Sequence, residues 1–466
     1  MKTLSSFALV LLLALFATAQ EAPKQKEVSE KPAPQQAPPP KITYIKAGRL
    51  FDSTGEQLKT NMVIVVEGER IKQVAPAAEV RIPQGAEVID LSNTTVLPGL
   101  IDLHTHLSSR ADRYAEIWDF KDTPFNSAFN AVKNAETTLM AGFTTVQDVG
   151  SLPFVMVDLR NSVNSGYLPG PRVVAAGPGI SITGGHGDMN NFSPYARSGS
   201  NMFPEQRGFG IADGVDQARQ TVRAQLKHDV DVIKIIATGG VLSKGDQPGA
   251  PQYTVEELKA AADEAHEAGR RITAHAHGAE GIKRAIAAGI DSIQHCSLVD
   301  DEGIKMALEK GTMFVMDIYN DDYLVGEAIK FGLPEENVEK EKLVGRLQRE
   351  NFQKAFKAGV KMGFGTDAGV YPHGDNAKQF FYMVKYGMTP AQAILAATRN
   401  SADSINNRLK GVGQIIPGNY ADIIAVAGNP LDDIRQMEKV QFVMKGGRVY
   451  RMPNPQPSAG SGRQRN

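Results

Sequence analysis

The sequence predicts an α/β protein built around a (β/α)8 barrel of the TIM type, with a small β-sandwich domain built from both chain ends. Three observations support this prediction. Eight short apolar segments, many ending in polar residues, alternate with longer, partly helical stretches in residues 98–409. Short β-branched runs occupy residues 42–97 and return in residues 410–452. The chain has 466 residues, 42% of them hydrophobic and 22% charged, which is enough for more than one structural unit.

The barrel strands are expected where an apolar run stops at a polar residue. At least one intervening helix is clearly indicated, because Thr254 and Glu257 form a capping-box pattern at its start and Gly269 closes the run. Pro390 suits the first turn of a later helix. The predicted strands are Val96–Leu103, Phe143–Val149, Arg172–Ala176, Asp231–Ala237, Arg271–Ala276, Asp291–His295, Met313–Ile318 and Lys361–Thr366.

The two chain ends are expected to lie outside the folded part. Residues 1–19 combine Lys2, an apolar run and small residues before Gln20, which is typical of a cleaved signal peptide. Residues 20–41 form a Pro-rich linker and residues 453–466 a disordered tail, because neither composition can bury apolar surface. The prediction is an exported protein, periplasmic or secreted, with no membrane attachment after signal cleavage.

Composition limits the kinds of partner. The formal net charge is -1, from 51 Lys and Arg against 52 Asp and Glu, so the chain has no global attraction to nucleic acid or to an anionic membrane. A small-molecule or dipeptide-like substrate is the expected partner. Cys296 is the only cysteine, which excludes an intrachain disulfide, so core packing and bound metal are expected to supply the stability.

Candidate metal ligands fall at the C-terminal ends of the predicted strands, the rim where barrel enzymes place their active sites. His104 and His106 lie two residues apart at the end of the first strand, so both side chains share one face and can bind one cation. His275 and His277 repeat this pattern on the fifth strand, and His295 ends the sixth. His275 is the preferred ligand of its pair, which leaves His277 to line the substrate pocket.

Two further residues complete the candidate site. Lys234 lies within an apolar strand, where a bare ammonium would be costly to desolvate. Carboxylation would make it an anionic carbamate that bridges two cations, whereas a lysine that snorkels or pairs with a carboxylate explains the residue alone equally well. Asp367 follows the eighth strand between glycines. It could bind a cation and accept a proton from a water activated by two cations, then pass it to a departing amine.

The order His-x-His, Lys, His, His, Asp on successive strands resembles the binuclear amidohydrolase superfamily. The segments Leu97–His104, Pro417–Asp422 and Gly428–Leu431 resemble this family as well. The resemblance implies two divalent metal ions and six residues that hold them: His104 and His106 at the more buried ion, carboxylated Lys234 as the bridge, His275 and His295 at the other ion, and Asp367 as both ligand and acid/base.

Two motifs resemble the imidazolonepropionase-like branch of the superfamily, which includes Xaa-Pro dipeptidases. They are the segment Ser181–Asp188 and the Ala-His-Ala-His-Gly stretch 274–278. The resemblance implies that His186, on a Gly-rich loop, polarises the substrate carbonyl from outside the metal shell; an exposed loop histidine is the alternative. His277 stands where some dipeptidases of this branch carry a tyrosine, so its substrate contacts are left open.

The expected function is metal-dependent hydrolysis of an amide bond, in a Xaa-Pro type dipeptide or an N-acyl amino acid. Zinc is the first choice of metal, and Mn2+, Co2+ or Fe2+ suit the same ligands. Family members are often multimeric, so a homo-oligomer is expected. Tyr371 and His373 could reach the same pocket or lie on exposed loops.

Two other functions stay open. One is a mononuclear metal deaminase or cyclic-amide hydrolase, in which His277 replaces His275 as ligand and forms a His-x-x-Glu pair with Glu280. Lys234 argues against this alternative, because a mononuclear enzyme has no evident need for it. The other is a catalytically inactive interaction protein, which is expected to have lost ligands.

Overall fold

The computed structural model describes residues 40–115, 117–188 and 210–453. The predicted signal peptide, nearly all of the predicted linker and all but the first residue of the predicted tail lie outside these residues. Among the described residues, no helix combines the length and the apolar character needed to cross a membrane.

Both chain ends contribute to one sheet of seven strands, in the order β15-β14-β13-β4-β1-β2-β3. The predicted β-sandwich is not what the described strands form, because they pair into this single sheet. The pairing is also mixed: β1 is antiparallel to β2 but parallel to β4. The strands are β1 (Ile42–Leu50), β2 (Lys59–Glu67), β3 (Arg70–Pro76), β4 (Glu87–Pro98), β13 (Ile423–Val426), β14 (Val440–Lys445) and β15 (Arg448–Arg451).

The first predicted barrel strand, Val96–Leu103, in fact covers the end of one strand and the first part of another. β4 ends at Pro98 in the seven-stranded sheet, and β5 (Leu100–Thr105) pairs with β6 in a separate parallel sheet. Gly99 makes the crossing, and its amide donates a hydrogen bond to the carbonyl of Asp422 at 2.8 Å. A Cβ at this position would collide with the side chain of Thr144. Glycine is therefore required where the chain passes from one sheet to the other.

Eight parallel strands form two hydrogen-bonded sheets, β5-β6-β7 and β12-β11-β10-β9-β8. Isolated parallel bridges connect their edges, between Ala176 and Val232 on one side and between Thr105 and Ala368 on the other. The strands are short, as the sequence predicts, and each is followed by helical structure. After β5 they are β6 (Phe143–Asp148), β7 (Arg172–Ala175), β8 (Val232–Ile236), β9 (Arg271–Gly278), β10 (Ser292–Leu298), β11 (Met313–Val315) and β12 (Met362–Gly363).

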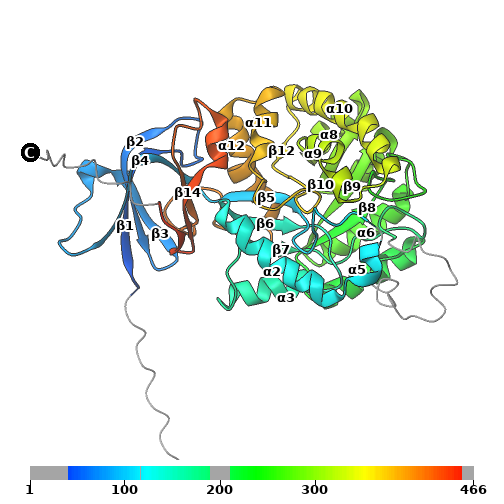
Figure 1. Ribbon diagram of the computed structural model, residues 1–466, viewed down its shortest axis with the longest axis horizontal. Coiled ribbons are helices and arrows are strands. Elements are labelled where there is room, and N and C mark those ends of the chain that lie inside the picture. The colour runs from blue at the N-terminus through cyan, green and yellow to red at the C-terminus, as the bar shows by residue number, and fades with distance from the viewer. Residues whose placement is uncertain (1–39, 116, 189–209, 454–466) are drawn as a thin grey trace, which may run out of the picture. The chain divides into compact units, whose positions relative to one another are not determined.

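Helices flank the parallel strands (Figure 1). The predicted capping box at Thr254 and Glu257 is confirmed and opens α6, while Thr389 caps the helix that begins at Pro390. The helices are α1 (Ile117–Lys121), α2 (Pro124–Met140), α3 (Val155–Asn164), α5 (Val215–Lys227), α6 (Val255–Glu267), α7 (Ala279–Ala287), α8 (Asp301–Lys310), α9 (Asn320–Gly326), α10 (Glu335–Ala358), α11 (Lys378–Lys385), α12 (Pro390–Leu395) and α13 (Ser401–Ile405).

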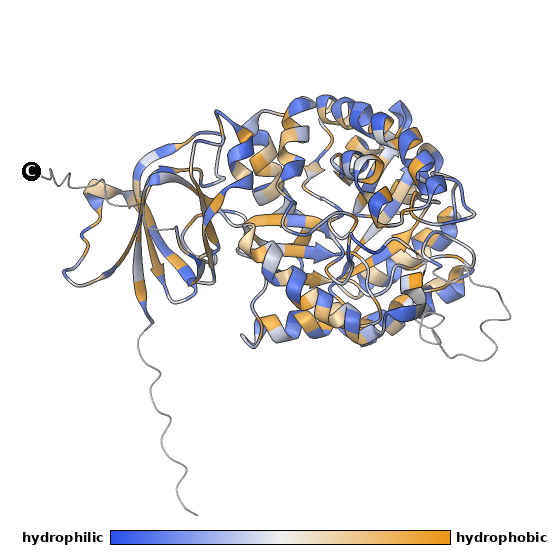
Figure 2. Cartoon of the chain, in the orientation of Figure 1, coloured by the Kyte–Doolittle hydropathy of each residue, from blue (hydrophilic) through white to orange (hydrophobic). Residues whose placement is uncertain are grey.

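The two parallel sheets share an apolar core. One cluster of buried side chains joins Leu103 of β5 and Val174 of β7 to Val232 of β8 and Val315 of β11. A larger cluster packs the outer side chains of the strands against the helices. Figure 2 shows the strands as largely hydrophobic and the helices as amphipathic. The carboxyl ends of the strands are therefore held in fixed positions by packing on both sides.

Candidate metal centre

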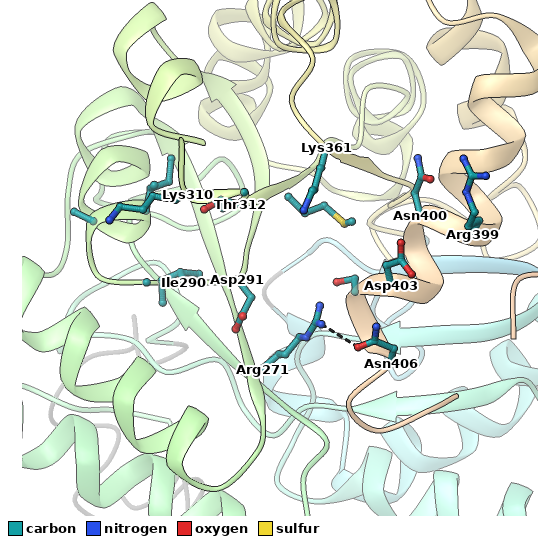
Figure 3. Close-up of a pocket in the computed structure, with 16 residues that line it drawn as sticks. Arg271, Ile290, Asp291, Lys310, Thr312, Lys361, Arg399, Asn400, Asp403 and Asn406 are labelled. Carbon is teal, nitrogen blue, oxygen red and sulfur yellow. Dashed lines mark hydrogen bonds between the residues drawn. The ribbon is translucent and has the colours of Figure 1, made fainter. Parts of the chain in front are cut away.

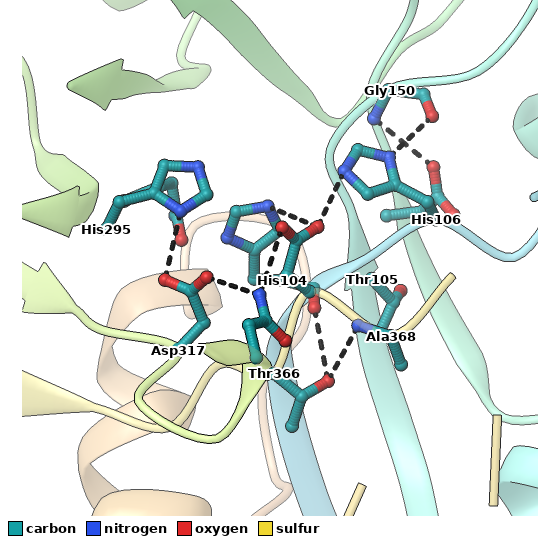
Figure 4. A network of polar contacts seen from close by, with 12 residues as sticks. His104, Thr105, His106, Gly150, His295, Asp317, Thr366 and Ala368 are labelled. Atoms are coloured by element: carbon teal, nitrogen blue, oxygen red, sulfur yellow. Dashed lines mark hydrogen bonds and ion pairs between the residues drawn. The ribbon is translucent and has the colours of Figure 1, made fainter. Parts of the chain in front are cut away.

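The predicted ligands lie in or just after the parallel strands, toward their C-terminal ends. His104 belongs to β5 and His106 follows its last residue, while Asp367 follows β12 by four residues. The other predicted ligands are Lys234 in β8, His275 and His277 in β9, and His295 in β10. Figure 4 shows His104 and His106, from the end of β5, together with His295 of β10.

His104, His106 and Asp367 form the first group of possible ligands, whose ligand atoms lie within 4.8 Å of one another. Nε2 of His104 is 3.3 Å, and Nε2 of His106 is 3.2 Å, from Oδ1 of Asp367. Burial alone would raise the pKa of Asp367, but the two histidines hold it well below its usual range. Asp367 is therefore available as a carboxylate, the form that binds cations.

His275, His277 and His295 form a second group, with ligand atoms also within 4.8 Å of one another. The rings of His275 and His295 are 4.5 Å apart between centroids. Burial lowers the pKa of His295 to about 3 and that of His275 well below its usual value. Neutral imidazole is the form that ligates metals, so the buried environment favours it. The group includes both histidines of β9, so this geometry does not decide which of the two is the metal ligand.

Hydrogen bonds fix the orientation of two of these rings. Nδ1 of His106 lies 3.0 Å from the carbonyl oxygen of Gly150, which can only accept, so Nδ1 is the donor. Nδ1 of His295 likewise donates to the Asp317 carboxylate at 2.9 Å. In a neutral ring the hydrogen on Nδ1 leaves a lone pair on Nε2. Both rings are thus oriented with Nε2 available as a ligand, as in metal-binding histidines.

The backbone is strained where two of these side chains turn into the site. His295 has a φ of 71°, the following Cys296 has 51°, and Asp367 has 57°. Non-glycine residues rarely adopt positive φ, and such conformations cluster at functional sites. At β10 the strain coincides with a register shift between His295 and Leu298 against β9. The bulge gives His295 a direction that a regular strand would not provide.

Lys234 is 3% exposed, and within the described part of the chain its Nζ has neither a hydrogen bond nor an ion pair. Burial lowers the pKa of its ammonium to about 8. The snorkelling and ion-paired alternatives do not apply to a lysine so placed. A fraction of its amines is neutral near that pH, and the neutral amine is the form that reacts with carbon dioxide.

His186 is half-buried within a polar network and is not an exposed loop histidine. Its ring stacks on His275 with centroids 4.3 Å apart, and its Nδ1 lies 2.7 Å from Oγ of Ser243. Ser243 directs its own hydrogen to Asp246 at 2.6 Å, so His186 must donate from Nδ1. Gly240 packs against the ring, since a Cβ there would lie 2.6 Å from both ring nitrogens. The ring is therefore firmly positioned beside the second group of ligands.

Tyr371 and His373 both lie within the fold. Tyr371 is fully buried, and its hydroxyl has no hydrogen-bond partner among the described residues. Nε2 of His373 lies 3.1 Å from the carbonyl of His106, and Nδ1 lies 3.2 Å from Oγ1 of Thr138. His373 therefore supports the backbone that carries His106.

Comparison with known proteins identifies the family. The model of the amidohydrolase family matches residues 95–450. The chain belongs to the amidohydrolase family. It is 33% identical over 434 residues to an ochratoxinase of Aspergillus niger, covering 90% of this chain and 88% of that protein. An imidazolonepropionase of Cutibacterium acnes is 24% identical, covering 85% of this chain and 92% of the other. The structure is similar to that of a Xaa-Pro dipeptidase with bound methionine, with a TM-score of 0.81, 39% identity and coverage of 88% and 100%.

The residues of this amidohydrolase fit a bound cation. Nδ1 of His104 and Nε2 of His275 are buried and lack hydrogen-bond partners within the described residues. Leaving buried polar atoms unpaired costs about 1–3 kcal/mol each, so a fold that retains two such atoms needs a compensating ligand. Both atoms belong to imidazole groups, which are metal ligands.

Asp317 is a site residue that the sequence analysis missed. The predicted strand ran to Ile318, but β11 ends at Val315, so Asp317 lies in the loop beyond the strand end. Its carboxylate binds His295 and also accepts hydrogen bonds from Asn320 at 2.6 Å and from Gln348 at 3.0 Å. Asp367 was predicted because it is a polar residue that follows an apolar strand. Asp317 would have met the same criterion if the predicted strand had ended at Val315.

A cavity of about 760 Å³ lies at the opposite ends of the strands. It is lined by Arg271, the first residue of β9, and by Met313, the first residue of β11, whereas His275 and His277 lie near the end of β9. Figure 3 shows Arg271 reaching toward Asn406 there. None of the predicted site residues lines this cavity, so it is separate from the metal centre.

Proposed function

We propose that this amidohydrolase cleaves an amide bond in a small substrate, either a Xaa-Pro type dipeptide or an N-acyl amino acid, with two divalent cations bound at the strand ends. The observation that carries the proposal is the presence of two groups of possible ligands, one with Asp367, that include the buried unpaired atoms Nδ1 of His104 and Nε2 of His275. Lys234 is buried and has no hydrogen bond or ion pair among the described residues, which supports its role as the bridge. The similarity to a Xaa-Pro dipeptidase supports the dipeptide, and the similarity to an ochratoxinase also supports amide hydrolysis.

The proposal assigns His104 and His106 to one cation and His275 and His295 to the other. Asp367 would complete the first site, and Lys234, as a carbamate, would join the two. His275 is preferred over His277 because its Nε2 is buried without a hydrogen-bond partner among the described residues. We also infer that the eight parallel strands close into one barrel, because single bridges connect the two sheets at both edges.

When bound, two cations would lower the pKa of a shared water and polarise the scissile carbonyl. Residues of the chain would then transfer the proton and bind the substrate. Asp367 accepts the proton of the attacking water and returns it to the departing nitrogen. His186 and His277 line the substrate side of the site. With Nδ1 committed to Ser243, only Nε2 of His186 can meet the substrate.

A mononuclear deaminase is the competing function. It would use His277 and Glu280, but Glu280 is engaged on α7 with Arg284 at 2.8 Å. Lys234 would also have no role in a mononuclear enzyme. These two observations favour the binuclear hydrolase.

The experiment begins with elemental analysis of the purified protein after growth with zinc, manganese, cobalt or iron. Close to two ions per chain is expected, and one ion per chain would favour the deaminase. A library of Xaa-Pro dipeptides and N-acyl amino acids is then screened for release of the amine product. A metal-replete protein that cleaves none of these amides would overturn the proposal and revive the inactive interaction protein.

Export and self-association also belong to the proposal. Removal of residues 1–19 is expected when the full chain is expressed with a secretion system, and the mass of the mature protein checks it. Sedimentation or light scattering of that protein is expected to show a homo-oligomer.

A further inference from the structure

One buried carboxyl group near the metal centre has no assigned task. Glu341 on α10 is 5% exposed, and it makes no hydrogen bond or ion pair within the described part of the chain. A buried carboxyl without a partner is unusual, since acidic side chains are seldom buried unless paired. The burial of the Glu341 carboxyl therefore needs an explanation.

The helix period places Glu341 on the face of α10 that covers the site. Asn337, one turn earlier, donates to the carbonyls of Val241 and Ser243, in the loop that follows β8. Gln348, two turns later, donates to the carbonyl of His295 and to Asp317. Residues four and seven apart on a helix share one face. Glu341 thus lies between two contacts of α10: one with the loop after β8, whose Ser243 bonds His186, and one with His295 of β10 and its partner Asp317.

Glycine at position 345 extends the same face. It lies one turn after Glu341, and a Cβ there would collide with the carboxylate of Asp321. Burial first, and then the charges of Asp321 and Asp317, raise the pKa of Glu341 to about 8. A cation bound beside Glu341 would oppose this shift and stabilise its carboxylate form.

Two basic side chains of α10 on either side of Glu341 already bind other carboxylates. Lys340 binds Asp246 and Glu336, each at 3.2 Å. Arg349 binds Asp321 at 3.0 Å and Asp322 at 2.9 Å. Arg349 lowers the pKa of Glu341 through its charge but does not bind it. Among the described residues Glu341 therefore has no direct cationic partner, which leaves it available to a cation from outside the chain.

We propose that Glu341 binds a cationic group of the substrate, a primary amine or a guanidinium, and so selects for amides that carry a positive charge. The proposal rests on the proposed amide hydrolysis and narrows its substrates. The charge could be the free α-amino group of a dipeptide or a basic side chain. Uncharged N-acyl amino acids would lack this contact.

The test uses the metal-replete full-length protein and two pairs of substrates. The first pair is a dipeptide with neutral side chains and its N-acetylated form. The second pair is an N-acetylated amide with a lysine or arginine side chain and its neutral counterpart with norleucine. A higher kcat/KM for the charged member of one pair is expected, and the pair that shows it identifies the source of the charge.

The variants separate recognition from structural support. Glu341→Gln keeps the shape of the side chain and is expected to lower kcat/KM for the charged substrate by about 10- to 100-fold, the effect of one charge-assisted hydrogen bond. The neutral substrate is expected to change by less than about threefold. Glu341→Asp, which retains the charge, is expected to keep part of the preference. The matched control is Glu339→Gln, since Glu339 pairs with Lys342 on the exposed side of α10.

Two outcomes count against the inference in different ways. If the neutral amides are cleaved and Glu341→Gln alters charged and neutral substrates equally, or alters neither, the cation site is wrong and the hydrolase assignment stands. If the wild-type protein cleaves no amide in either pair or in the library, the proposed function itself fails, and the inference with it.

Discussion

Nδ1 of His295 lies 2.9 Å from Oδ1 of Asp317, and this bond determines which ring nitrogen of His295 can bind a cation. Both residues are almost completely buried, with side-chain exposures of 7% and 5%. A carboxylate behind a metal-binding histidine fixes its tautomer and raises its basicity. This hydrogen bond links β10 to the loop after β11. His295 and Asp317 both lie just beyond the residues through which the two strands pair.

Removal of this carboxylate is expected to weaken metal binding. Asp317→Ala should lower the affinity for the cation held by His295 by about 10- to 100-fold, since the ring loses its hydrogen-bond acceptor. Competition with a chromogenic chelator measures the change. Asp322→Ala, at a more exposed carboxylate that binds Arg349, is the control. Equal affinities in wild type and Asp317→Ala would show that the bond has no part in metal binding.

Lys234 should be essential for the pair of cations. Lys234→Ala is expected to lose one metal ion and to lower kcat by at least about 100-fold, because the bridge between the sites is removed. Elemental analysis and the amide assay are run on the same sample. Lys227→Ala, at the exposed end of α5, serves as the comparison. Retention of both ions and full activity in Lys234→Ala would exclude the carbamate.

A single methyl group is expected to displace His186. Gly240→Ala places a Cβ against the imidazole, so the ring must move away from Ser243. A shift of about 1 Å can cost about 100-fold in rate, so kcat/KM should fall 10- to 100-fold while metal content is unchanged. Gly326→Ala, where an added Cβ meets nothing within 4 Å, is the control. Unchanged kinetics in Gly240→Ala would remove His186 from the substrate site.

The raised pKa of Glu341 predicts that the free energy of unfolding depends on pH. Burial, with Asp321 and Asp317 nearby and Arg349 opposing them, raises its pKa from 4.5 to about 8 in the folded chain. Between these values the folded state binds more protons than the unfolded state, so Glu341 contributes stability below pH 4.5 that is lost as the pH rises through 8. The slope is at most about 1.4 kcal/mol per pH unit.

Urea unfolding of the metal-free protein at pH 6 and pH 8 measures this effect. Wild type is expected to lose stability over this interval, and Glu341→Gln, which cannot ionise, is expected to lose less. Use of metal-free protein avoids the separate pH dependence of cation binding. Parallel losses in the two proteins would show that Glu341 does not titrate in this range.

Much of the candidate site could be predicted because its residues carry local signals. His104, His106, His275 and His295 stand at the ends of apolar runs, and chain direction alone places the ends of parallel strands at one rim. Asp367 follows the last run between glycines. The helix starts at Thr254 and Thr389 were equally local, since a capping box involves residues only three positions apart.

Other features depend on residues far apart in the sequence. The sandwich was expected because alternating runs indicate strands without indicating their partners, and the pairing of β1 with β4 joins segments more than 40 residues apart. The crossing at Gly99 was hidden within one continuous apolar run. Asp317, Ser243 and Glu341 are polar residues in loops or on a helix, with no periodicity that marks them.

The sequence by itself determined which side chains could hold cations and on which strand ends they stand, because strand period and chain direction are local properties. Only the tertiary structure decided which of those atoms are left unpaired, which ring nitrogen faces the site and which buried carboxyl lacks a partner. Hydrogen bonding and desolvation depend on atoms brought together from distant parts of the chain, and no window of sequence contains both members of such a pair.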